Sequence, residues 1–221
     1  MKPNTIASAE LFVATGCRHC PVILNELSEQ LKKGELSSLT VTNIAVDNKK
    51  AASLNIRSVP WFSLENDISY MIFSGDHSPK EIQKWLSTSQ KSEGMQEYIE
   101  DYLSNGQLMT IVQVVKSRPA IFSELIKMLE DEDTSMNVRI GLDALIEQFT
   151  GSEMLQQHTA DFIKIASGNN VRLQIDALHY IALTADASNI EYLKEKTLDK
   201  DEQVKEAAIE AIETLNDLLV D

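Results

Sequence analysis

The sequence contains only two cysteines, and it has neither a second Cys-x-x-Cys pair nor a His-x₃-His pair. A structural zinc ion needs four ligands, so we expect no metal site. Long apolar runs are also missing, because no stretch approaches the roughly 18 residues that a membrane span needs. Residues 1–10 lack the apolar core of a signal peptide. We therefore expect a cytoplasmic protein without a membrane partner.

Positive charge is scarce in the second part of the chain. Residues 1–90 contain nine Lys/Arg and nine Asp/Glu, which leaves 11 of the 20 cations and 25 of the 34 acids to residues 91–221. The formal net charge of −14 therefore belongs entirely to that part. An acidic surface repels phosphate backbones, which argues against nucleic acid as a partner. The change in charge predicts two domains, 1–90 and 91–221, each large enough for its own core.

The first part alternates between strand and helix patterns. Short runs of β-favouring apolar residues predict strands at 9–14, 39–46, 61–65 and 68–73. Helix signals fall between and after them, at 21–33, 48–54 and 78–88. In the last of these, Ser78 is a cap residue, Pro79 suits the first helical position, and Glu81 completes a capping box. The predicted order is β-α-β-α-β-β-α, which is an α/β fold.

Cys17 and Cys20 lie where the first predicted strand gives way to the first predicted helix. In a reducing cytosol, a close cysteine pair is more often catalytic or metal-binding than structural. The backbone N–H groups and the dipole of a helix start stabilise a thiolate, and Arg18 and His19 add positive charge beside it. We therefore expect a lowered pKa for Cys17, which makes it the nucleophile. Cys20 is expected to be buried and to resolve the mixed disulfide.

The tripeptide Ser58-Val59-Pro60 precedes the third predicted strand, and Pro60 follows Cys17 by 43 residues. Together with the element order and the Cys-x-x-Cys before a helix, this pattern resembles the thioredoxin-like superfamily over residues 8–88, particularly its compact glutaredoxin-like members. The resemblance implies a thiol–disulfide oxidoreductase that acts on protein disulfides. It also implies a cis peptide bond before Pro60 and a substrate-binding groove at Val59, Pro60 and Trp61.

Several positions depart from that family's pattern. Leu11 stands where thioredoxins carry a buried acid, and Trp61 stands where threonine often follows the proline. The histidine of Arg18-His19 resembles that of disulfide isomerases, and its charge predicts a less reducing disulfide than that of thioredoxin. Only Gly75-Asp76 represents the family's glutathione-binding stretch. We expect no cofactor besides the redox-active Cys17–Cys20 disulfide, and glutathione-linked exchange is a lesser alternative.

The second part shows only helical patterns after a polar linker at 87–93. Eight helices are expected, at 95–103, 107–115, 119–130, 136–149, 153–166, 170–184, 187–198 and 201–219. The pairs Val138-Arg139, Val171-Arg172 and Val204-Lys205 recur at intervals of 33 residues. They resemble the second helix of HEAT-type repeats, which implies an all-α solenoid that presents an extended surface to a protein partner.

These patterns predict a redox domain fused to a helical-repeat domain for protein recognition. The expected partners are proteins with disulfides, a protein bound by the helical repeats, and a reductase that recycles the dithiol. The alternative is a protein without catalysis, in which both parts serve as a scaffold or redox sensor. A structural cysteine pair would fit that alternative.

Overall fold

A computed structural model of the chain describes residues 5–220, so the first four residues of the amino-terminal stretch lie outside the described range. The chain forms two compact units. The first comprises Met1–Tyr102 and Met109–Ile121, and the second comprises Leu103–Leu108 and Phe122–Asp221. The predicted boundary at residue 90 falls within the first unit and stays a prediction. Over the described residues, no helix combines the length and apolar character that crossing a membrane requires.

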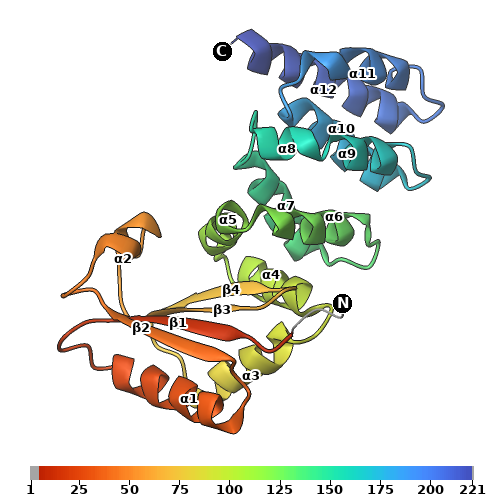
Figure 1. Cartoon of the computed structure of the whole chain (residues 1–221). Helices are drawn as coiled ribbons and strands as arrows, with labels where there is room; N and C mark the ends of the chain where they lie inside the picture. Colours follow the sequence, from red (N-terminus) through yellow and green to blue (C-terminus); the bar gives the residue numbers. More distant parts are fainter. Residues whose placement is uncertain (1–4, 221) are drawn as a thin grey trace. The chain divides into compact units, whose positions relative to one another are not determined.

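The first unit is built on a four-stranded sheet in the order β2-β1-β3-β4 (Figure 1). The central strand β1 is parallel to β2 and antiparallel to β3, which pairs in turn with β4 in the antiparallel sense. The strands and their first three helices are β1 (Ser8–Val13), α1 (Cys20–Lys33), β2 (Ser38–Asn43), α2 (Lys49–Ser53), β3 (Trp61–Glu65), β4 (Tyr70–Ser74) and α3 (Pro79–Ser89). The predicted order β-α-β-α-β-β-α is confirmed.

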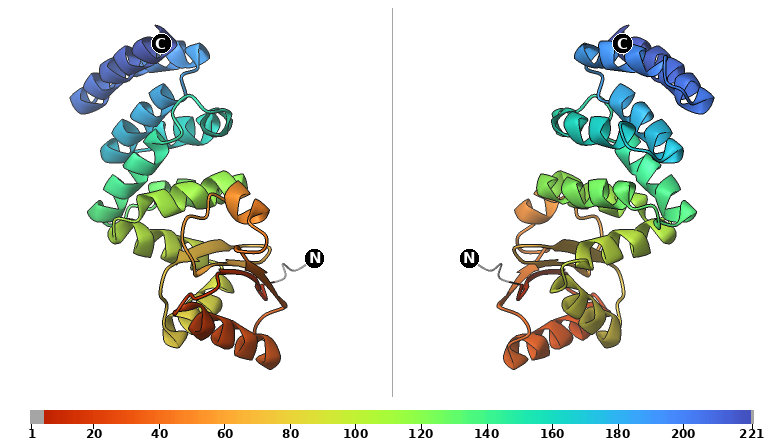
Figure 2. Two further views of the ribbon diagram at one scale, coloured as in Figure 1. Left: turned by 90° about the vertical axis from the view of Figure 1, so that its left-hand side faces the viewer. Right: turned by 90° about the vertical axis from the view of Figure 1, so that its right-hand side faces the viewer.

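Helices cover both faces of this sheet. α1 and α3 pack against each other on one face, whereas α2 and α5 (Leu108–Ser117) lie over the other (Figures 1 and 2). The Gln113 side-chain amide of α5 donates a hydrogen bond to the Leu54 carbonyl at 2.8 Å, which holds α5 beside the end of α2. Because β3 is covered on both sides, its first four residues, Trp61 to Leu64, are all buried.

The edge strand β4 is closed by a tyrosine from α4 (Gly94–Ser104) instead of by another strand. The Tyr98 hydroxyl accepts the N–H of Ile72 at 3.2 Å and donates to the carbonyl of the same residue at 2.6 Å. An exposed strand edge is a template for unwanted pairing, so this double contact protects the sheet. Burial raises the pKa of Tyr98 well above its usual value, which keeps the hydroxyl protonated and able to donate.

Over its described residues, the second unit consists of helices joined by turns. Its helices match the predicted positions, except that the helix expected at 153–166 is divided at His158 and two others begin with a 3₁₀ turn. They are α6 (Phe122–Glu130), α7 (Met136–Glu147), α8 (Glu153–Gln157), α9 (Thr159–Ala166), α10 (Val171–Leu183), α11 (Ile190–Lys196) and α12 (Glu202–Val220). α10 packs against both α9 and α12, and α6 packs against α7, so consecutive helices form layers (Figure 2).

The 33-residue repeat places its members near the starts of α7, α10 and α12. The basic residues at this position are not equivalent in the fold. Arg139 is only 4% exposed, and its guanidinium donates to the carbonyls of Asp131 and Thr134 in the turn before α7. Arg172 is exposed, and its guanidinium donates to the Glu132 carbonyl at 3.4 Å. The repeat is therefore regular in sequence, but Arg139 is buried whereas Arg172, one repeat later, is exposed.

Candidate functional site

Cys17 and Cys20 form a disulfide at the junction of β1 and α1, with an S–S distance of 1.97 Å and a Cα–Cα distance of 5.5 Å. After β1 ends, Gly16 adopts a positive φ of 81°, which glycine tolerates better than other residues. The Cys17 N–H then donates to the Ala14 carbonyl at 3.2 Å and closes the turn. The predicted sequence of strand, cysteine pair and helix is confirmed.

The two sulfur atoms have different surroundings. Cys20 is the first residue of α1 and is 5% exposed, whereas Cys17 is only half-buried. The backbone N–H of Cys20 donates to Cys17 Sγ at 3.1 Å. Backbone donors at a helix start also stabilise a sulfur atom that carries negative charge. Cys17 is thus the cysteine that an incoming molecule reaches more easily, and Cys20 is buried behind it as expected.

The segment before β3 approaches the same end of the sheet. Phe12 in β1 pairs with Trp61 in antiparallel β3, so the end of β1 and the beginning of β3 are neighbours. The Val59–Pro60 peptide bond is cis, as expected, and Pro60 is buried whereas Val59 is half-buried. The cysteine loop and the proline loop therefore leave the sheet side by side.

Trp61 is turned into the protein interior. Its side chain is 4% exposed, and its ring meets that of Phe12 edge to face with 5.4 Å between centroids. The expected wall of a substrate groove would need an accessible tryptophan surface. A substrate-binding role for Trp61 therefore stays a prediction, as do the roles of Val59 and Pro60.

The loop after β4 joins the other two loops. Because β4 is antiparallel to β3, its end lies beside the beginning of β3, and the Gly75 N–H donates to the Pro60 carbonyl at 2.9 Å. The next residue, Asp76, places its carboxylate 3.2 Å from Nδ1 of His19 in the cysteine loop. This contact links the segment between the cysteines to the loop that holds Pro60.

The contact of Asp76 with His19 is the feature of this site that the sequence pattern did not reveal. Asp76 drew attention only as a trace of a glutathione-binding stretch, and its position after the last strand was the available signal. A topology that brings the ends of β1 and β4 to one edge of the sheet would have placed the two side chains near each other. Arg18, the other residue between the cysteines, is exposed to solvent.

Metal ligands are not gathered at this site or elsewhere in residues 5–220, where no group of three or more His, Cys, Asp or Glu side chains could hold an ion. Chemically, the Cys17–Cys20 pair could be reduced and reoxidised, and a second molecule could reach Cys17. Arg18 and the His19–Asp76 pair belong to the same loops. No protein-family model and no curated protein matches the chain.

Proposed function

We propose that the chain is a thiol–disulfide oxidoreductase that acts on protein disulfides. In this proposal the first unit is a thioredoxin-like domain, and the second is a HEAT-like repeat domain that recognises proteins. The observation that carries the proposal is the Cys17–Cys20 disulfide at the start of α1, with an accessible Cys17 in front of a buried Cys20. Nucleophilic cysteines need such an exposed position with nearby N–H donors or positive charge.

The proposed reaction exchanges one disulfide for another. The Cys17 thiolate attacks a substrate disulfide and bonds to one sulfur, while the other substrate cysteine leaves as a thiolate and takes a proton from water. Cys20 then loses its proton and attacks Cys17, which forms the Cys17–Cys20 disulfide and releases the first substrate sulfur as a second thiol. Two electrons have passed from the dithiol to the substrate. A recycling reductase, the remaining expected partner, returns two electrons to the pair.

The residues around the cysteines support separate parts of this reaction. Arg18 and His19 add positive charge beside Cys17, which favours the thiolate. Val59 would align an extended substrate segment beside the cysteine loop. Leu11 is fully buried in β1 and offers no proton acceptor, so water or His19 would handle the proton of Cys20. We propose no cofactor beyond the disulfide itself, and a cytoplasmic location.

Reduction of insulin by dithiothreitol tests this function. The wild type is expected to accelerate the reaction, and Cys17→Ser is expected to remove the acceleration. Cys20→Ser is the matched variant, because it keeps the nucleophile and, when mixed with insulin in the absence of dithiothreitol, should accumulate a mixed disulfide with the substrate, visible by intact mass. A wild type no faster than Cys17→Ser would reject catalysis and favour the scaffold or redox sensor.

Incubation with oxidised glutathione separates protein disulfides from glutathione as the substrate. Under the proposed function, Cys20→Ser traps insulin more readily than glutathione when both are offered. A predominant Cys17–glutathione adduct in the same mixture would support glutathione-linked exchange instead. The adduct is recognised by its mass, so the two outcomes are distinct.

A further inference from the structure

The contact between His19 and Asp76 involves the positive charge of a protonated His19. When the disulfide is reduced, the Cys17 thiolate can become a second negatively charged partner for that charge. In the structure the disulfide is closed, and the Asp76 carboxylate lies 3.2 Å from Nδ1 of His19. His19 itself lies between the two cysteines, immediately before the start of α1. Its imidazolium, when protonated, is therefore held by a carboxylate from another loop while no thiolate is present.

Reduction creates a competing negative charge. Two molecules of glutathione convert the Cys17–Cys20 disulfide to a dithiol and leave as one glutathione disulfide, so two electrons enter the pair. When Cys17 loses its proton, a thiolate forms two residues from His19. A cation stabilises such a thiolate and a nearby carboxylate destabilises it. Asp76 destabilises the Cys17 thiolate in two ways. Its carboxylate pairs with His19, which is then less available to the thiolate, and it carries a negative charge of its own.

We propose that Asp76 is a positioning residue that competes with the Cys17 thiolate for His19 and thereby makes the Cys17–Cys20 pair more reducing. This inference rests on the proposed redox function. The charge of Arg18 and His19 alone favours the dithiol, and Asp76 offsets part of that effect in the closed form. The Gly75–Pro60 hydrogen bond fixes the loop that carries Asp76, so the competitor stays beside the cysteine loop.

Solvent exposure sets the size of the effect. The side chains of His19 and Asp76 are 57% and 63% exposed, so water and dissolved salt screen their attraction. Ion pairs in such surroundings change equilibria by about two- to fivefold. Salt at about 1 M shortens the screening distance to about 3 Å, which should remove most of the effect.

The test is the equilibrium of the full-length protein with glutathione, approached from both sides and read by alkylating the free thiols and weighing the products. Asp76→Asn is expected to shift the equilibrium about two- to fivefold toward the dithiol at about 0.01 M salt, and less at about 1 M. In a His19→Gln background, the same substitution is expected to shift the equilibrium by less than half as much.

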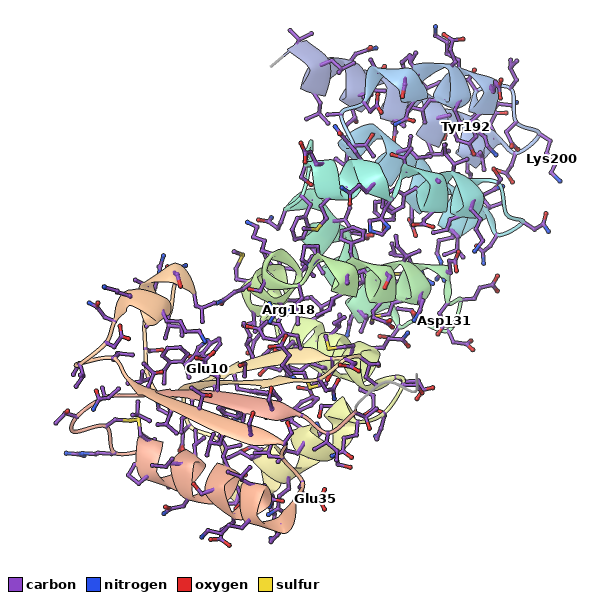
Figure 3. The ribbon with its side chains drawn as sticks, in the orientation of Figure 1. Glu10, Glu35, Arg118, Asp131, Tyr192 and Lys200 are labelled. Carbon is purple, nitrogen blue, oxygen red and sulfur yellow. A yellow bond between two sulfur atoms is a disulfide. The ribbon has the colours of Figure 1, made fainter. Side chains whose placement is uncertain are left out.

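Glu35→Gln is the matched control, because it removes one acid from the same unit at the other end of α1. The helix has 14 residues, so at 1.5 Å per residue its end lies about 20 Å from the cysteines. Figure 3 labels Glu35 just beyond that end of α1. This control should leave the equilibrium unchanged. An equal shift in Asp76→Asn and Glu35→Gln would reduce the effect to net charge and overturn the inference.

Two further results would overturn the inference. One is an unchanged or more disulfide-favouring equilibrium in Asp76→Asn, and the other is an equal shift with and without His19. Failure of the proposed function would give a different result. In that case the wild type would not accelerate insulin reduction, while the glutathione equilibrium would still respond to Asp76→Asn. Unaltered insulin reduction without any shift in that equilibrium would reject the competition alone.

Discussion

The two units satisfy their buried polar groups in different ways. In the first unit, the exposed backbone of edge strand β4 is closed by the neutral hydroxyl of Tyr98. In the second unit, helices satisfy most of their own backbone, and the buried Arg139 guanidinium holds the turn before α7. The comparison teaches that a sheet unit depends on a helix supplied from elsewhere in the chain, whereas a helical unit depends on its turns.

The largest effect is expected when the helices that complete the first unit are removed. A fragment of residues 1–121 is expected to unfold cooperatively, whereas residues 1–90 should fail to fold. The shorter fragment lacks Tyr98 and also the Gln113 contact to Leu54. Tryptophan fluorescence measures this directly, because Trp61 and Trp85 are the only tryptophans and both are present in each fragment.

A fragment of residues 1–90 that melts at the same temperature as 1–121 would contradict this expectation. It would show that the boundary indicated by the change in charge is also a folding boundary. In that case α4 and α5 would only rest on the sheet. Both fragments contain Cys17 and Cys20, so a difference between them does not come from the loss of either cysteine.

Loss of Arg139 should strongly destabilise the second unit. Arg139→Met keeps apolar volume but removes the guanidinium that donates to the carbonyls of Asp131 and Thr134 and that lies 3.9 Å from the Asp176 carboxylate. Breaking a buried charged contact of this kind costs about 3 kcal/mol. Far-UV circular dichroism should show the loss, while tryptophan fluorescence of the first unit should be unchanged.

The repeat supplies a control for this substitution. Arg172 occupies the same place one repeat later but is exposed, so Arg172→Met should cost less than about 0.5 kcal/mol. Similar losses in both variants would mean that the repeat position, and not the burial of Arg139, determines the stability.

The local signals of the sequence placed nearly every element. The capping box of Ser78 and Glu81, which the structure contains, marked the start of α3, and Gly34 ends α1 with a positive φ. These signals act within a few residues, so a single sequence carries them. The contact of Tyr98 with Ile72, 26 residues away, depends on where α4 crosses the sheet. The contact of His19 with Asp76 likewise requires the sheet order, which no local pattern encodes.

The edge of β4 offers a smaller and sharper test than the fragments. Tyr98→Phe removes one hydroxyl, which leaves the Ile72 N–H without its acceptor and the Ile72 carbonyl with only the longer contact to Tyr102, so the free energy of unfolding should fall by about 1–3 kcal/mol. Urea unfolding followed by tryptophan fluorescence measures the change. Tyr102→Phe is the matched control, because that hydroxyl reaches the Ile72 carbonyl only at 3.4 Å and should cost less. A larger loss of unfolding free energy in Tyr102→Phe than in Tyr98→Phe would show that Tyr102, and not Tyr98, closes the edge of β4.

The smallest expected effect is a dependence on pH in the second unit. Burial, and then the nearby Asp143 carboxylate, raises the pKa of Asp176 above its ordinary value. The folded unit therefore binds this proton more tightly than the unfolded chain, so the group stabilises the fold fully below its unfolded pKa of about 3.9. That stabilisation is lost as pH rises from there through the higher folded pKa.

Asp176→Asn should remove this pH dependence, because asparagine stays neutral. Relative to wild type, the variant should gain stability as pH rises above about 4 and keep a constant advantage beyond the folded pKa of Asp176. Thermal unfolding by circular dichroism at several pH values measures the difference. Glu206→Gln, at an exposed position of α12, should show no such trend. A variant whose advantage is greatest at low pH would reverse the sign and show that attraction to Arg139 outweighs the cost of burying the Asp176 carboxylate.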